Sequence, residues 1–313
     1  MKARLQITLV LSILMIIVFS VFAYMYQDKL YIFYRDNILK SRNNIVLKKN
    51  DYYKKDNYLY VENTDNFIVK DKKDIRNVLY TIINSGIDKF TFYCDDDYFT
   101  CTNDIDEIAN DQNILSNINN FVHPYNSFKE INTSYDERGN ITISINKTYS
   151  SDDIEKLNTK VDEIIKEVIT DNLDNKSKIR KIHNYIINNS KYATESIVSN
   201  NPNLSVSKAN GALLEGYGNC NSYADAMAIF LNKLNIKNYK IASDTHVWNL
   251  VYPDDEWLHL DLTWDDPVNS DGSDTLEVTF FLITDSRLKE LAVDMHDYDS
   301  NIYLELNPNE KEA

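Results

Sequence analysis

Hydrophobic and polar residues follow three patterns along this chain, and each pattern predicts a different kind of structure. An almost unbroken apolar run from Leu5 to Tyr26 is long enough to cross a bilayer as a helix. Apolar residues spaced three and four apart predict amphipathic helices over residues 151–172 and 176–190. Strict alternation over residues 141–145 predicts a strand with one buried face. The chain therefore combines an N-terminal membrane signal with a mixed α+β region.

The apolar run at the N-terminus is interpreted as an uncleaved signal anchor over residues 1–27. Lys2 and Arg4 precede the run and favour a cytoplasmic N-terminus, which places the remainder of the chain outside the cytoplasm. Four basic residues on the other side favour the opposite orientation: Lys29, Arg35, Lys40 and Arg42. The alternative is a cleaved signal peptide followed by secretion, for which Val21–Ala23 offers compact residues at a cleavage point.

Two regions separate the anchor from the C-terminal half. Residues 28–60 are polar and rich in tyrosine and lysine, without periodicity, and are expected to form a linker or stalk. Residues 61–150 are expected to form a small α+β module with a helix over 75–83, a strand over 89–94 and a hairpin around 136–139. A polar stretch over 104–120 is expected to be helical, and nothing in this module names a chemistry.

Charge and cysteine content limit the possible functions. The 313 residues include 33 basic and 48 acidic ones, so the net charge is −15 and a nucleic-acid partner is excluded by the lack of a basic footprint. The acidity keeps the surface soluble and is compatible with an amine-bearing partner. Cys94 and Cys101 could close a small disulfide loop or remain two reduced thiols. In either case Cys220 is left over as a candidate reactive thiol.

Cys220 follows a cluster of glycines in a chain that has only six glycines. Gly216 and Gly218 allow a tight turn directly before it, and a helix is predicted to begin at Cys220. The helix is predicted from apolar residues at 224, 227, 228, 231 and 234. A helix N-terminus favours a thiolate, and its free N–H groups can help to hold an oxyanion.

A predicted hairpin brings a base and an acid together. If Tyr252 pairs with Trp257 across the turn Pro253–Glu256, then Leu250 faces His259, Trp248 faces Asp261 and His246 becomes a diagonal neighbour of Asp261 on the same face. A slip of one residue would place them on opposite faces. Cys220, His246 and Asp261 would then supply a nucleophile, its base and the group that orients the base.

Each of these residues also has a purely structural interpretation. Cys220 alone could be a small buried residue, His246 a strand histidine and Asp261 a turn cap. Trp248 could wall a substrate site or pack in the hairpin core, and Tyr223 could contact substrate or pack on the helix. His123 and His183 are interpreted as structural. Two pairs of aspartates are expected to form a solvated acidic loop rather than a calcium site: Asp265, Asp266, Asp271 and Asp274.

From about Lys176 to Pro267 the sequence resembles the transglutaminase-like superfamily of papain-like cysteine enzymes. The resemblance is carried by Gly-x-Gly-x-Cys-x-x-Tyr-Ala at 216–224, His-Val-Trp-Asn at 246–249 and Asp-Leu-Thr-Trp-Asp-Asp-Pro at 261–267. It implies a core of a cysteine-bearing helix packed on an antiparallel sheet, within a domain over 151–313. Ser222 stands where many relatives have glycine. The upstream oxyanion partner is not assigned, with Asn201, Asn203 and Asn210 as candidates.

The resemblance implies catalysis by Cys220 as nucleophile, His246 as general base and acid, and Asp261 as its orienter. The expected reaction is acyl transfer on a peptide or carboxamide bond through a thioester, by a peptidase, an amidase or a transamidase, without a cofactor or metal. The expected substrate is a peptide or protein at the cell surface, for example a cell-wall peptide. The alternative is a non-catalytic scaffold of the same fold that binds peptides or wall components.

Overall fold

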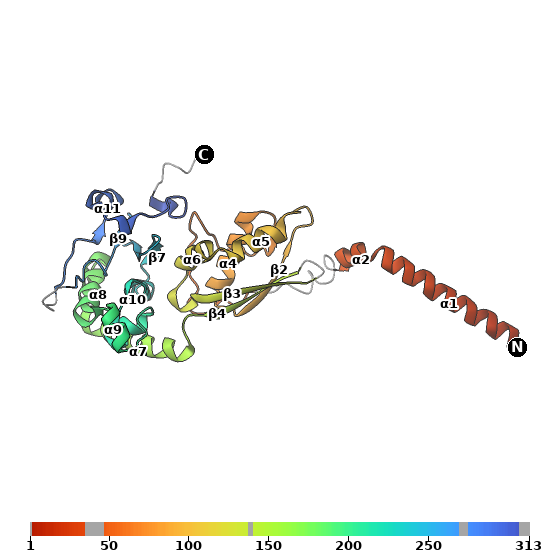
Figure 1. Ribbon diagram of the computed structural model, residues 1–313, viewed down its shortest axis with the longest axis horizontal. Helices are drawn as coiled ribbons and strands as arrows, with labels where there is room; N and C mark the ends of the chain where they lie inside the picture. The colour runs from red at the N-terminus through yellow and green to blue at the C-terminus, as the bar shows by residue number, and fades with distance from the viewer. Residues whose placement is uncertain (1, 35–46, 137–139, 269–274, 307–313) are drawn as a thin grey trace. The chain divides into compact units, whose positions relative to one another are not determined.

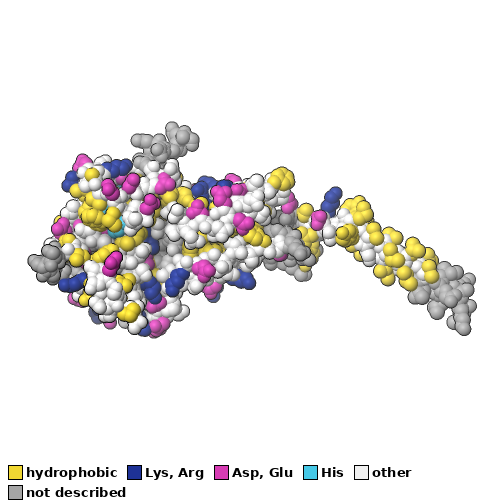
Figure 2. Space-filling view, in the orientation of Figure 1, with side chains coloured by type: hydrophobic (Ala, Val, Ile, Leu, Met, Phe, Trp, Pro, Cys, Tyr) yellow, Lys and Arg dark blue, Asp and Glu magenta, His cyan; other side chains and the backbone are white. Residues whose placement is uncertain are grey.

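The computed structural model describes residues 2–34, 47–136, 140–268 and 275–306. The chain divides into two compact units, Met1–Leu47 and Lys48–Ala313. The first unit contains α1 (Lys2–Met25) and α2 (Gln27–Tyr34). The apolar side chains of α1 that are described are exposed, and Figure 2 shows them covering the helix in yellow.

The N-terminal helices bear on the predicted membrane anchor. Within the described residues, no single helix is both long and apolar enough to cross a membrane. Val10–Met25 and Gln27–Tyr34 pass that test together, as a pair bent by 73°. This supports the anchor in part, by length and composition.

The second unit begins with a four-stranded sheet of order β1-β2-β4-β3. Its strands are β1 (Ile68–Val69), β2 (Lys89–Cys94), β3 (Phe128–Tyr135) and β4 (Asn140–Lys147). β1 pairs with β2 in parallel, and the other pairs are antiparallel. Three helices pack together along one side of this sheet (Figure 1): α4 (Lys72–Asn84), α5 (Cys101–Asn110) and α6 (Gln112–Asn120). The predicted helix, strand and hairpin of residues 61–150 are all present.

A disulfide closes the segment between β2 and α5. Cys94 and Cys101 are bonded, with their Cα atoms 6.0 Å apart. Of the two possibilities left open by the sequence, the structure has the disulfide. The third cysteine, Cys220, is therefore the free thiol.

The C-terminal part is built around a second four-stranded sheet of order β10-β9-β8-β7, antiparallel throughout. Its strands are β7 (Lys237–Ala242), β8 (Val247–Tyr252), β9 (Leu258–Leu260) and β10 (Phe281–Ile283). α10 (Cys220–Lys233) packs on β7 and β8, with α7 (Ser151–Val168) and α8 (Asn175–Asn189) behind it (Figure 1). Mixed helices and antiparallel sheets confirm the predicted α+β class.

Short elements complete the fold. The segment before α10 contains a π-helical turn η3 (Gly211–Glu215) and β6 (Tyr217–Gly218), and β6 pairs in parallel with β5 (Lys191–Tyr192), which follows α8. The remaining elements are η2 (Pro124–Asn126), α9 (Glu195–Asn200), α11 (Asp285–Leu291), η4 (Asp294–His296) and η5 (Leu304–Leu306). Buried apolar side chains from α7, α8, α10 and β8 form one core, in which Met227 and Phe230 are fully buried.

The structure differs from the linker expected over residues 28–60. From Lys48 onward the chain belongs to the compact unit, and Tyr58 is only 2% exposed because its ring packs on Tyr239 and Phe121. Lys54 is buried as well, and its ammonium group donates to the carbonyl of Asn238. Burial lowers the pKa of Lys54 to about 7. Aromatic packing thus joins this segment, α6 and β7 in one unit, where separate domains were expected at 61–150 and 151–313.

Candidate active site

Cys220 is the first residue of α10, and the turn before it depends on two glycines. Gly216 has φ of +77°, a conformation that side chains disfavour. A Cβ atom on Gly218 would lie 2.7 Å from Oγ of Ser222, so only glycine fits there. Asn219 caps the helix, with its side-chain oxygen accepting from the amides of Asn221 and Ser222. The turn presents Cys220 half-buried at the helix N-terminus.

His246 and Asp261 meet at the ends of two paired strands. β8 and β9 pair Asn249 with Leu260 and Leu250 with His259, which is the register predicted from the sequence. His246 directly precedes β8 and Asp261 directly follows β9. Nε2 of His246 lies 2.6 Å from Oδ2 of Asp261, and both side chains are 2% exposed. The pairing of base and carboxylate is therefore fixed by the hairpin.

The carboxylate and the thiol together hold a proton on His246. Burial lowers the pKa of His246, but hydrogen bonds to Asp261 and Cys220 and the charges of these groups outweigh it and raise the pKa to about 9. Burial likewise raises the pKa of Asp261, and hydrogen bonds from His246 and His296 outweigh it and lower the pKa to about 2. Since Nε2 of His246 is bound to Asp261, Nδ1 is the ring nitrogen that remains for the thiol. The site thus favours an imidazolium beside the sulfur.

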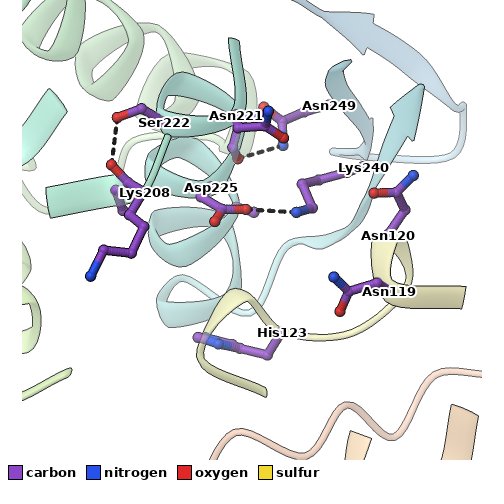
Figure 3. Close-up of polar contacts among 12 residues, drawn as sticks. Asn119, Asn120, His123, Lys208, Asn221, Ser222, Asp225, Lys240 and Asn249 are labelled. Carbon is purple, nitrogen blue, oxygen red and sulfur yellow. Dashed lines mark hydrogen bonds and ion pairs between the residues drawn. The ribbon is translucent and has the colours of Figure 1, made fainter. Parts of the chain in front are cut away.

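Several buried polar contacts hold α10 in place (Figure 3). Ser222, which stands where many relatives have glycine, donates to the carbonyl of Lys208 at 2.7 Å. It also accepts from the amide of Ala212 at 2.9 Å. Asp225 accepts from Lys240 at 2.7 Å. It also accepts from the hydroxyl of Tyr149 at 2.6 Å. These contacts fix the direction in which α10 presents Cys220.

Trp248 and Tyr223, the predicted substrate-binding residues, are both 1% exposed. Trp248 stacks on His246, with ring centroids 5.7 Å apart, and donates to Nδ1 of His259 at 3.0 Å. The hydroxyl of Tyr223 donates to Asp266. Each side chain is enclosed by the fold and exposes almost no surface, and contact with a substrate stays a prediction for both. They stabilise the base and the helix.

The acidic loop differs from its prediction as well. Asp265 and Asp266 are buried, with 0% and 5% exposure, and were expected to be solvated. Asp265 accepts from Nε2 of His183 at 3.1 Å and from the amide of Phe280 at 2.9 Å. These bonds anchor α8 to the segment after β9. Asp271 and Asp274 lie outside the described residues.

The sequence did not reveal Tyr192, which lies near the thiol. Tyr192 pairs with Gly218 through β5 and β6. Burial raises its pKa, and the negative charge of Cys220 raises it further. The three asparagines proposed as oxyanion partners lie elsewhere: Asn201 and Asn203 are exposed, and Asn210 donates to Asp153 at 2.7 Å. Tyr192 was missed because it lies in β5, a strand of two residues that has no periodicity for a sequence pattern to show.

His296, in η4, was also missed. Its Nε2 lies 2.8 Å from the same Oδ2 of Asp261 that binds His246. The donor atoms of His246, Asp261 and His296 all lie within 4.8 Å of one another, so in size the group could hold a metal ion. However, the 2.6 and 2.8 Å contacts have the length of charge-assisted hydrogen bonds.

Comparison with known proteins identifies one part of the chain. Residues 162–262 match the sequence model of the Transglutaminase-like superfamily, a stretch that includes Cys220, His246 and Asp261. No curated protein sequence matches the chain.

Three solved structures are similar over parts of their length. They are a TGase (13% identity, 46% of each chain, TM-score 0.33), a proposed cysteine protease from Cytophaga hutchinsonii (16% identity, 47% of this chain and 65% of that one, TM-score 0.27) and a proposed protease from Parabacteroides distasonis ATCC 8503 (12% identity, 47% and 34%, TM-score 0.23). The aligned part thus spans less than two thirds of each of these proteins. At these scores we draw no conclusion from the similarity.

Proposed function

We propose, for a chain whose residues 162–262 match the model of the transglutaminase-like superfamily, that Cys220, His246 and Asp261 catalyse acyl transfer through a thioester. The observation that carries the proposal is the position of His246. Its Nε2 is hydrogen-bonded to Asp261, and the interaction of the ring with Cys220 helps to raise the pKa of His246. A nucleophile, a base and an orienting carboxylate in contact are the arrangement that activates a thiol.

The proposed reaction follows from these contacts. The Cys220 thiolate attacks the carbonyl carbon of an amide, and the resulting oxyanion forms beside the start of α10. Asn219 occupies the amides of Asn221 and Ser222, which leaves the amide of Cys220 as the first-turn donor to the oxyanion. The imidazolium of His246 then gives its proton to the leaving amine as the C–N bond breaks. Water releases the acid, or an incoming amine forms a new amide, with His246 accepting the proton.

The substrate is proposed to be a peptide or protein amide. Whether water or an amine completes the reaction depends on the acceptor, so the proposal includes both peptidase and transamidase activity. Mass spectrometry of products formed from a peptide substrate, with and without an added primary amine, distinguishes them. A gain of one water marks hydrolysis, and a new amide marks transfer.

The decisive experiment uses the full chain and its single free thiol. Iodoacetamide should alkylate Cys220 at neutral pH faster than an ordinary thiol, because a neighbouring imidazolium favours the thiolate. Cys220→Ala should remove both the adduct and the activity, and His246→Phe should slow alkylation while leaving the thiol in place. A wild-type thiol that reacts only near pH 8.5 or above would contradict catalysis and favour the non-catalytic scaffold.

We also propose that residues 5–26 anchor the chain in a membrane, with the catalytic unit outside the cytoplasm. The disulfide between Cys94 and Cys101 supports this location, because disulfides persist mainly in oxidising compartments. Carbonate extraction of cell membranes should leave the full chain in the pellet. A membrane-impermeant maleimide should label Cys220 in intact cells, with Cys220→Ala as the control. Labelling only after lysis would contradict the location.

A further inference from the structure

Asp261 binds two histidines, and the proposed reaction uses only one of them. Oδ2 accepts from Nε2 of His246 at 2.6 Å and from Nε2 of His296 at 2.8 Å. Oδ1 accepts from the amides of Thr263 and Trp264. An ionised carboxylate can only accept hydrogen bonds. Each imidazole must therefore carry a proton on Nε2, which leaves Nδ1 of His246 free to act on the sulfur.

His296 is built into the site rather than resting on its surface. The side chain is 2% exposed, its ring stacks on Phe280 with centroids 4.9 Å apart, and Trp248 meets it edge-on at 4.9 Å. Its Nδ1 finds no partner among the described residues. A buried imidazole loses its hydration, so its bond to Asp261 is what offsets that cost. That bond is therefore the most specific interaction of this side chain.

Metal coordination is a poor explanation for this geometry. A tetrahedral zinc ion with bonds of about 2.0–2.1 Å would hold its ligand atoms roughly 3.3 Å apart. The two nitrogens lie 2.6 and 2.8 Å from the same carboxylate oxygen. These distances suit a carboxylate that accepts two N–H groups, so we treat the contacts as hydrogen bonds.

We propose that His296 is a positioning residue that sets the orientation and basicity of Asp261, and through Asp261 the proton affinity of His246. The inference rests on the proposed function of the site. Two donors share Oδ2, so each receives part of its negative charge. Without the N–H of His296, Asp261 would attract the proton of His246 more strongly. His296 thereby keeps the imidazolium acidic enough to release its proton to a leaving amine.

The ionisable groups around His296 come from several elements. His246 and Asp261 lie at the ends of β8 and β9. His259 of β9 is also close, since its pKa, lowered mainly by burial, is lowered further by His296. Asp294 and Asp297 flank His296 in its own segment. Both replacements at 296 should therefore be uncharged, so that neither adds an ion to this group.

A matched pair of variants tests the proposal in the full chain. His296→Phe keeps an aromatic ring and removes the donor, whereas His296→Gln places an amide N–H where Nε2 was and removes the ring. The readout is the rate of Cys220 alkylation by iodoacetamide from pH 5 to pH 10, which in the wild type should change near pH 9 as His246 loses its proton. His296→Phe should move this step upward by roughly 0.5–1 pH unit. His296→Gln should leave it near the wild-type position.

Each remaining outcome decides against the proposal. No shift in either variant, or the same shift in both, would show that His296 only fills space. If EDTA removed the step and zinc restored it, His296 would be a metal ligand and not a hydrogen-bond donor to Asp261. A wild-type thiol that reacts only near pH 8.5 or above would overturn the proposed function, and this inference with it. If thermal denaturation shows that His296→Phe does not fold, His296→Asn replaces it, because its amide is too short to reach Asp261.

Discussion

The side-chain amide of Asn249 donates a hydrogen bond of 3.0 Å to the main-chain carbonyl of Ala224 (Figure 3). Asn249 is buried in β8, and Ala224 lies in the second turn of α10. β8 begins directly after His246, and α10 begins with Cys220. This bond therefore links the strand that carries the base to the helix that carries the nucleophile, and it restricts the distance between them.

Asn249→Leu tests that link, since leucine has a similar size and no donor. We expect the free energy of unfolding to fall by about 1–3 kcal/mol, because a buried polar contact is lost. We also expect Cys220 to be alkylated several-fold more slowly at pH 7. Asn232→Leu is the control: Asn232 donates to the carbonyl of Ala228 at 2.7 Å, near the far end of the same helix. Urea denaturation measures the free energy of unfolding, and intact-mass kinetics measure the alkylation rate of Cys220. Equal slowing of alkylation in the two variants would argue against the link.

The pKa of His246 predicts how stability depends on pH. That pKa rises from 6.5 to about 9 in the folded chain, so folding favours the protonated ring. The resulting stabilisation is complete below about pH 6.5 and is lost as pH rises through about 9. Asp261 has the opposite sign: its pKa falls to about 2, so its contribution is present above about pH 4 and is lost toward pH 2.

Urea midpoints measured at intervals from pH 6 to pH 10 check the histidine contribution. The stability difference between wild type and His246→Phe should shrink across this range. Asp261→Asn removes the carboxylate that raises the pKa of His246. The stability difference between Asp261→Asn and His246→Phe should therefore change much less with pH. A difference between wild type and His246→Phe that is constant from pH 6 to pH 10 would refute the assignment.

The disulfide between Cys94 and Cys101 should matter for stability but not for the thiol site. It closes a short loop, with a sequence separation of 7, and chain-entropy estimates for a loop of this size give about 2.5 kcal/mol. We expect Cys94→Ala/Cys101→Ala to lose about that much free energy of unfolding. The alkylation rate of Cys220 should stay unchanged, because the disulfide belongs to the β2–α5 segment. A slower Cys220 in a folded double variant would contradict this separation.

The sequence predicted those parts of the site that depend on local periodicity. The pairing of Tyr252 with Trp257 across the turn gave the predicted register, and the register placed His246 beside Asp261. The glycines and the apolar spacing located the start of α10 at Cys220. Each prediction needed only one element or one hairpin.

Features that depend on contacts between distant segments could not be predicted in this way. His296 reaches Asp261 from a three-residue 3₁₀ turn that has no pattern of its own. The sequence predicts that Asp265 is a solvated charge, yet the side chain is buried and bonds to His183, which lies 82 positions earlier. The large aromatic ring of Trp248 is of a kind that can line a substrate site, but its burial depends on the residues that pack over it. Tertiary contacts decide these cases.

Asp225 and Lys240 form an almost entirely buried ion pair beneath the site. Their side chains are 5% and 8% exposed, their charged atoms lie 2.7 Å apart, and Tyr149 donates to the second carboxylate oxygen. Lys240→Met would leave Asp225 buried and without its cation. Breaking a buried pair from one side typically costs about 3–5 kcal/mol, because an uncompensated charge remains.

Asp225→Leu combined with Lys240→Met removes both charges and should recover most of that loss, as apolar replacements of buried pairs often do. Lys233→Met provides the surface control: Lys233 lies 2.6 Å from Asp162, but the side chains are 45% and 58% exposed. Its loss should cost less than about 1 kcal/mol, because solvent screens the pair. Chemical denaturation compares the three variants. If Lys240→Met cost no more than Lys233→Met, the pair would not hold α10, and the direction of Cys220 would have to be fixed by Ser222 and Asn249 instead.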